Sequence, residues 1–176
     1  MNKTILSFFG FASVLVLGSP AFAGTFVSEY SSIAAKDCKI VKSGVGYDIA
    51  QCPSHDGYGV SVTDDEGASS VILKAKGKDI LLTADAVKPE PPLQFQLPYV
   101  AGDKLEWRYE TGAGKKTLSG VIFRVGDQSW PEKQTVLFVT RVNGDAFCPL
   151  GAVKTNEAAR KLVDGGKACA LAATQP

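Results

Sequence analysis

The sequence lacks an excess of charge of either sign and lacks long apolar runs beyond its first residues. Its 19 basic residues are nearly balanced by 18 acidic residues, and Lys3 is the one charged residue before position 24. Proteins that bind nucleic acid or anionic membranes normally carry a basic excess or a basic stripe. No stretch after residue 23 is apolar for long enough to cross a bilayer as a helix. We therefore expect no nucleic-acid partner and no integral membrane segment in the mature chain.

The sequence also has only one histidine, His55, and no C-x-x-C pair. Zinc sites are built from such ligands, so we expect no metal site, and we expect no other cofactor. An even number of cysteines in an exported chain normally forms disulfides. The four cysteines allow three pairings. We favour Cys38–Cys52 and Cys148–Cys169, because each bond then closes a short segment within one half of the chain.

Residues 1–23 have the pattern of a secretory signal peptide. Lys3 supplies the positive charge, residues 5–17 form a short apolar region, and Ala21-Phe22-Ala23 matches a small-x-small cleavage site. We expect cleavage before Gly24 and export of the mature chain to the periplasm or to the outside of the cell. No cysteine lies at the cleavage point, which argues against a lipid anchor.

The mature chain, residues 24–176, is long enough for a single β-rich domain that buries roughly 70% of its unfolded surface. Prolines are concentrated in residues 84–98, where they remove backbone donors and fix φ: Pro89, Pro91, Pro92 and Pro98. This composition predicts an extended connector or an edge segment. It is the one candidate for an internal boundary, and two small subdomains are the alternative to a single core.

Short segments with alternating apolar and polar residues predict β-strands separated by Gly-rich turns. They are residues 39–42, 47–52, 59–63, 69–75, 79–83, 105–110, 117–125 and 136–142. Such spacing is typical of an antiparallel meander rather than of βαβ units. We predict a mainly-β fold, an antiparallel β-sandwich or barrel-like meander, with residues 24–36 as a loose lead-in.

Residues 135–151 predict the central hairpin of this fold. Asn143-Gly144 favours a two-residue type I′ turn, in which both central residues have positive φ. Residues 136–142 are apolar on nearly both faces, as expected for a strand in the middle of a packed sheet.

One short helix is predicted near the C-terminus. Thr155 or Asn156 can cap it, and Gly165-Gly166 ends it. Between them an apolar stripe is formed by Ala158, Ala159, Leu162 and Val163. A Cys148–Cys169 bond would tie this helix to the hairpin.

Several motifs occur in a fixed order in the second half of the chain. They are Leu105-Glu106-Trp107-Arg108, Gly120-Val121-Ile122-Phe123-Arg124, residues 136–141, Cys148, and Glu157-Ala158-Ala159-Arg160 followed by Cys169. This pattern resembles small exported proteins of alphaproteobacteria that have no assigned function. The resemblance implies a bacterial envelope setting and one β-rich domain. It implies no catalytic residue, cofactor or partner.

Ser54-His55-Asp56 contains the three residue types of a hydrolase triad. Side chains adjacent in sequence diverge, whereas a triad needs them to converge from separate segments. We therefore interpret His55 as a solvated loop residue. The catalytic alternative is that His55 pairs with a distant serine or aspartate.

Two acidic groups are further candidates. The turn at Asp64-Asp65-Glu66-Gly67 offers oxygen ligands but lacks the spacing of a calcium loop, so we interpret it as an acidic turn. Glu106, Arg108 and Glu110 share one strand face, which we interpret as solvated and self-neutralising.

Trp130 lies in a loop before Pro131, where an exposed aromatic side chain is a reasonable interface anchor. The alternative is that its ring covers the edge of a core. With Tyr58 and His55, Trp130 completes the candidate binding residues, and we assign no catalytic residue.

These observations favour a non-catalytic exported binding or interaction module of the bacterial envelope, with an inhibitor as one form. Its partner would be an envelope protein or a small ligand. One alternative is a small periplasmic hydrolase that uses His55 or a carboxylate pair drawn from Asp64, Asp65, Glu106 and Glu110. The other alternative is a structural accessory protein of the envelope.

Overall fold

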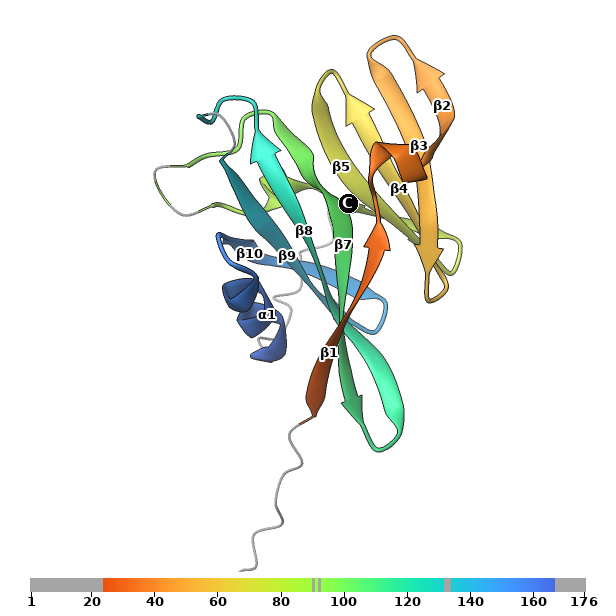
Figure 1. Cartoon of the computed structure of the whole chain (residues 1–176), viewed down its shortest axis with the longest axis vertical. Coiled ribbons are helices and arrows are strands. Elements are labelled where there is room, and N and C mark those ends of the chain that lie inside the picture. Colours follow the sequence, from red (N-terminus) through yellow and green to blue (C-terminus); the bar gives the residue numbers. More distant parts are fainter. Residues whose placement is uncertain (1–23, 90, 92, 132–133, 167–176) are drawn as a thin grey trace, which may run out of the picture.

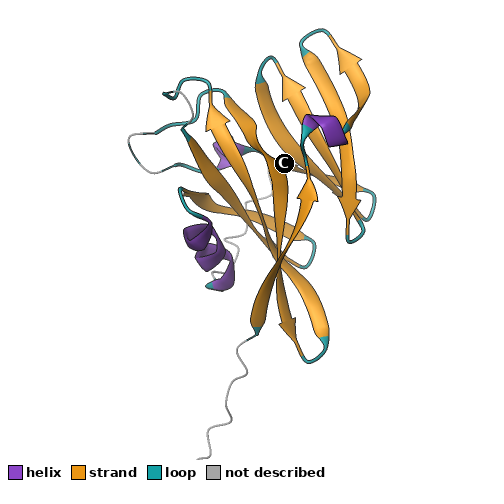
Figure 2. Ribbon diagram, viewed as in Figure 1, coloured by secondary structure: helices purple, strands orange, loops and turns teal. Residues whose placement is uncertain are grey.

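The computed structural model describes residues 24–166 except 90, 92, 132 and 133, and in this part the chain forms two five-stranded antiparallel sheets (Figures 1 and 2). The meander sheet has the order β2-β3-β4-β5-β6, and the helix-side sheet has the order β1-β7-β8-β9-β10. The strands are β1 (Thr25–Ser32), β2 (Lys39–Gly44), β3 (Tyr47–His55), β4 (Tyr58–Asp65), β5 (Ala68–Ala75), β6 (Lys78–Leu82), β7 (Pro98–Gly112), β8 (Lys115–Asp127), β9 (Thr135–Asn143) and β10 (Ala146–Val153). Two 3₁₀ turns, η1 (Ala35–Asp37) and η2 (Ala84–Ala86), and the helix α1 (Asn156–Asp164) complete the described elements.

The two sheets pack face to face, and α1 covers the opposite face of the helix-side sheet. The main core combines Val60, Val71 and Leu73 of the meander sheet with Trp107 and Phe123 of the helix-side sheet. A second cluster lies beneath the helix: Ile122, Leu137, Val139, Ala159 and Val163. The predicted mainly-β sandwich with one short C-terminal helix is confirmed.

The strand β9 shows why a strand can be apolar on both faces. Val136, Phe138 and Val142 belong to the core between the sheets, whereas Leu137 and Val139 pack under α1. A strand that lies between a sheet and a helix has no side facing water, so both of its faces are apolar.

The β9–β10 hairpin forms where it was predicted, but the predicted type I′ turn is wrong. Asn143 pairs with Ala146, so the two central residues are Gly144 and Asp145. Of these two only Gly144 has a positive φ, 61°. A single positive φ at the first central position is the arrangement of a type II′ turn, in which glycine is preferred there.

Residues 24–36 were predicted to be a loose lead-in, and this prediction is wrong. Within them β1 pairs with β7 along its whole length, from Thr25 opposite Thr111 to Ser32 opposite Lys104. The strand lies at the edge of the sheet, and many of its side chains are partly exposed, so its sequence carries no strong apolar alternation. Its partner is far away in the chain, and no local signal reveals it.

The helix α1 begins as predicted. The Thr155 side chain accepts a hydrogen bond from the backbone N–H of Ala158 at 3.2 Å, and Gly165 is the C-cap. Ala159 and Val163 are fully buried against the sheet. No helix in the described ranges is long and apolar enough to span a membrane.

The Cys38–Cys52 disulfide is present, as predicted. It joins the segment before β2 to the middle of β3, where Cys52 is buried. Cys169 lies outside the described residues, so the Cys148–Cys169 bond stays a prediction. The signal peptide, residues 1–23, also lies outside the described residues.

Candidate functional site

His55 belongs to a polar cluster at which the β3–β4 hairpin meets the helix-side sheet. Its ring stacks on that of Trp107, with 4.9 Å between centroids. Its Nε2 atom lies 3.2 Å from the Oε2 atom of Glu29 on β1. The His55 side chain is only 18% exposed, so the interpretation as a solvated loop residue is wrong. The hairpin thus closes over the buried Trp107 ring through His55 and Tyr58.

Three more charged or polar groups complete this cluster. The Tyr109 hydroxyl donates to Asp56 at 3.0 Å, and Lys116 Nζ lies 2.7 Å from Glu29 and 3.6 Å from Asp56. Burial, and next the hydrogen bond to Asp56, raise the pKa of Tyr109. The hydrogen bond to Glu29 raises the pKa of Lys116. Acids and bases are thus paired with one another and connect the two sheets.

The structure does not bring Ser54, His55 and Asp56 together as a triad. Asp56 accepts from Tyr109, and the charged neighbour of His55 is Glu29. Sequence reasoning missed Glu29, Tyr109 and Lys116, because the paired residues are far apart in the chain, from 26 positions for Glu29 and His55 to 87 positions for Glu29 and Lys116. Tyr58 packs its ring near Trp107 and Phe147, at 5.4 and 6.2 Å between centroids. It lies at the rim of the core.

Trp130 lies in the loop after β8, and contacts with the segment before β7 fix its side chain. Its indole N–H donates to the backbone carbonyl of Gln94 at 2.7 Å, and its ring stacks on Phe95 at 5.0 Å between centroids. The side chain is half-buried, so one part of the ring remains accessible. Trp130 therefore fits both interpretations in part. Its ring packs against the edge of the core, and it also contributes to a surface.

That surface is a groove of about 580 Å³ between the ends of the two sheets, which we call the Trp130 groove. Asp64, Gly67 and Ser69 line it from the meander sheet, and Tyr99, Gln128 and Trp130 line it from the other side. Two hydrogen bonds close its base: Gln128 Nε2 donates to the Gly67 carbonyl at 2.9 Å, and the Val100 N–H donates to Ser69 Oγ at 2.6 Å.

Asp127, at the end of β8, fixes the loop that carries Trp130. The residue is 3% exposed, and its carboxylate accepts from the backbone N–H groups of Gln96, Leu97 and Ser129 and from the Ser129 hydroxyl. Burial by itself would raise the pKa of Asp127, but these four hydrogen bonds outweigh it and lower the pKa. The charged carboxylate thus joins the segment before β7 to the Trp130 loop.

The acidic turn between β4 and β5 forms one rim of the Trp130 groove. Glu66 and Gly67 are its central residues, both with positive φ, and Asp64 Oδ1 accepts from the Gly67 N–H at 3.3 Å. Among the described residues no group of three or more His, Cys, Asp or Glu side chains could hold a metal ion. The sequence did not reveal that this turn and Trp130 share a groove.

The face that carries Glu106, Arg108 and Glu110 was interpreted as solvated. This is wrong for Glu106 and Arg108, because α1 lies over them, whereas Glu110 is exposed. Glu106 is 6% exposed and accepts from Arg160 Nε at 2.7 Å and from Ser28 Oγ. Arg108 donates to both carboxylate oxygens of Asp164, at 2.9 and 2.6 Å. The hydrogen bond to Glu106 raises the pKa of Arg160. The partners of this strand face thus come from the helix.

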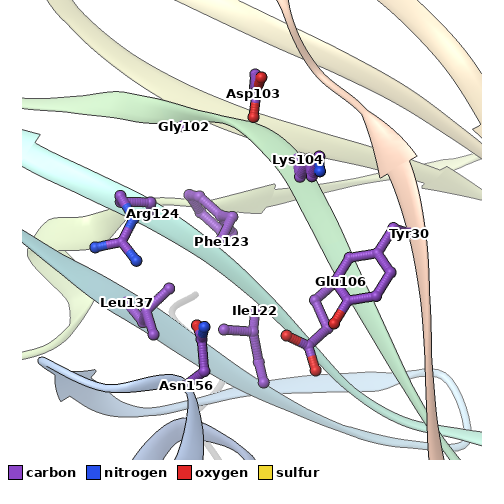
Figure 3. A pocket seen from close by; sticks show the side chains of 10 residues that line it. All are labelled: Tyr30, Gly102, Asp103, Lys104, Glu106, Ile122, Phe123, Arg124, Leu137 and Asn156. Carbon is purple, nitrogen blue, oxygen red and sulfur yellow. The ribbon is translucent and has the colours of Figure 1, made fainter.

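A pocket of about 200 Å³ lies on this same side of the sheet, and Figure 3 shows its lining side chains. Glu106 and Tyr30 form one side of it, and Arg124, Leu137 and Asn156 form another. It shares no lining residue with the Trp130 groove.

Comparison of the chain with family models, with curated proteins and with solved structures finds no match. The resemblance to small exported alphaproteobacterial proteins therefore stays a prediction, and function has to be argued from the geometry of the chain itself.

Proposed function

We propose that this protein is a non-catalytic exported binding module of the bacterial envelope, and that it holds its partner in the Trp130 groove. The observation that carries the proposal is the position of Trp130, an accessible aromatic ring that Gln94 and Phe95 hold rigidly at the junction of the two sheets. Large aromatic side chains in well-packed positions are the usual anchors of binding surfaces.

The groove also has the size and the rigidity that binding favours. Its volume of about 580 Å³ is within the roughly 300–1,000 Å³ typical of ligand sites. The hydrogen bonds that Asp127 accepts and the one that Gln128 donates order the loop before any partner arrives, so little conformational entropy is lost on binding. The carboxylate of Asp64 and the amide of Gln128 supply polar contacts beside the ring.

The Cys38–Cys52 disulfide supports an exported location, because such bonds persist in oxidising compartments. Among the described residues, the acids and bases around His55 are paired with one another, which favours a structural role for that cluster over a hydrolytic one.

The test is capture of envelope components by the immobilised, oxidised protein, followed by affinity measurement for each captured component. Trp130→Ala is compared with Leu81→Ala, which truncates a side chain 57% exposed on β6, away from the groove. We expect Trp130→Ala to weaken binding by about 30-fold or more, which corresponds to roughly 2 kcal/mol for an anchor residue. Leu81→Ala should bind as the native protein does.

Fluorescence gives an independent readout, because the chain has two tryptophans and Trp107 is fully buried. Iodide should quench Trp130 in the free protein, and a bound partner should protect it. The protection should disappear in Trp130→Phe, in which only Trp107 emits. Equal affinity of all variants, or protection that persists in Trp130→Phe, would refute the assignment of the groove.

A further inference from the structure

We propose that the pocket shown in Figure 3 is a second site, which binds a small monocarboxylate through the guanidinium of Arg124. It is independent of the Trp130 groove, with which it shares no lining residue.

An irregularity in the pairing of β7 with β8 creates this pocket. Val100 pairs with Val125 and Leu105 pairs with Phe123, so the four residues 101–104 lie opposite the single residue Arg124. The extra residues bend β7 away from a regular ladder at this point. Gly102 lies against Arg124, and a Cβ atom there would be 3.0 Å from the Cβ of Arg124. The absence of a side chain at Gly102 lets β7 pass this close to Arg124.

Arg124 differs from the other arginines of the helix-side sheet and α1. Arg108 and Arg160 are paired with carboxylates, and Arg141 donates to the Val163 carbonyl at 2.8 Å. Arg124 donates from Nη1 to Thr135 Oγ1 at 3.0 Å, and within the described part of the chain it has no ion-pair partner. The contact with Thr135 holds a half-buried guanidinium in place, with donors left for a ligand.

The charges around the pocket favour an anion with a single charge. Lys104 adds a second cation at the rim, and Asp103 adds one exposed carboxylate. The remaining acid, Glu106, is already compensated by Arg160, at 2.7 and 3.3 Å, and does not compete for Arg124. Arg124 and Lys104 carry two positive charges and Asp103 carries one negative charge, so the pocket has one uncompensated positive charge. Asn156 lies at the start of α1, the positive end of the helix dipole.

The size and lining of the pocket favour a short carboxylic acid. Its volume of about 200 Å³ is well below that of the Trp130 groove and suits a short molecule. Ile122 and Leu137 provide apolar contacts for a hydrocarbon body, and the planar fork of Arg124 fits a carboxylate. Figure 3 shows the guanidinium and the Leu137 side chain on the same side of the hollow.

The experiment is an NMR titration of the oxidised, ¹⁵N-labelled protein with butyrate, and separately with inorganic phosphate and with chloride. We expect saturable shifts of the Gly102, Ile122 and Asn156 amides with butyrate. Arg124→Gln should raise the dissociation constant at least tenfold. Lys115→Gln removes an exposed charge at the far end of β8 and should leave the dissociation constant unchanged.

Two further variants keep the test decisive if Arg124→Gln folds poorly. Arg124→Lys keeps the charge but loses the planar fork, and should also weaken butyrate binding. Lys104→Gln changes an exposed residue and should weaken it two- to threefold. Absence of saturable shifts with butyrate, equal affinity of native protein and both Arg124 variants, or stronger binding of phosphate than of butyrate would each overturn the proposal.

Discussion

Replacement of Asp127 by asparagine should destabilise the protein substantially, although the two side chains have nearly the same shape. The carboxylate accepts four hydrogen bonds, two at Oδ2 from the N–H groups of Gln96 and Leu97 and two at Oδ1 from Ser129. An amide has one oxygen and one NH₂ group. Turned one way, its NH₂ group faces the N–H groups of Gln96 and Leu97; turned the other way, it faces the Ser129 N–H, and only the Ser129 hydroxyl can rotate to accept from it. In either orientation at least one buried N–H donor lacks an acceptor.

The magnitude follows from the burial of this residue, which is 3% exposed. A buried donor without an acceptor costs roughly 1–3 kcal/mol, and hydrogen bonds to a charged acceptor contribute about 1.5–3 kcal/mol. We expect the free energy of unfolding of Asp127→Asn to fall by about 3 kcal/mol. For a domain of this length the melting temperature should fall by roughly 6–12 °C.

Chemical and thermal denaturation of the oxidised protein measure this loss. Asp145→Asn is the matched control, because Asp145 is also paired, with Lys76 at 2.6 Å, but its side chain is 74% exposed. A surface pair contributes at most about 1 kcal/mol. The control should therefore lose much less stability than Asp127→Asn does.

The effect should also depend on pH. The pKa of Asp127 in the folded protein lies below the ordinary value of 3.8, so its contribution to stability is complete above that pH and is lost as the pH falls through the lowered pKa. The difference in stability between the native protein and Asp127→Asn should shrink in acid. A loss under 1 kcal/mol at neutral pH, or a difference that stays constant into strong acid, would refute this account of the Trp130 loop.

Two other substitutions test the fold directly. Replacing Cys38 and Cys52 by serine should cost about 3 kcal/mol, since the bond closes a loop with a sequence separation of 14, and amide exchange should show β2 losing protection first. Protection of β2 equal to that of the oxidised protein would contradict this. Gly120→Ala should cost about 1–3 kcal/mol in denaturation experiments, because its Cβ would lie 2.6 Å from the Val163 side chain and displace α1. Gly112→Ala, with no atom within 4 Å of the added Cβ, is the control, and equal losses would contradict the close packing of α1.

The fold class could be predicted from the sequence because its signals are local. The alternation of Leu105, Trp107 and Tyr109 identified a strand with one buried face, and all three side chains are buried. Thr155 and Gly165 marked the ends of the helix, because capping depends on residues within a few positions of one another. The Cys38–Cys52 pair was also predicted from its short separation.

Only the tertiary structure decided which distant residues meet. The pairing of β1 with β7 could not be predicted, since β1 is a partly exposed edge strand whose hydrogen-bonding partner lies far along the chain. The burial of Glu106 could not be predicted either, because its position on the charged face of a strand indicated solvent exposure. The helix that buries it carries Arg160, 54 positions later.

In the two proposed sites as well, the sequence indicated at most a single residue, and the tertiary structure decided which residues meet. Trp130 could be singled out from its loop and its proline neighbour, but the sequence did not show that Asp64 of the meander sheet would face it across a groove. Nothing in the sequence around Arg124 indicated a binding site, because its proposed role depends on the four residues of β7 that bulge opposite it. Periodicity and turn chemistry act over a few residues and determine strands and caps, whereas sites are formed by the packing of segments whose separation in sequence carries no record of their contact.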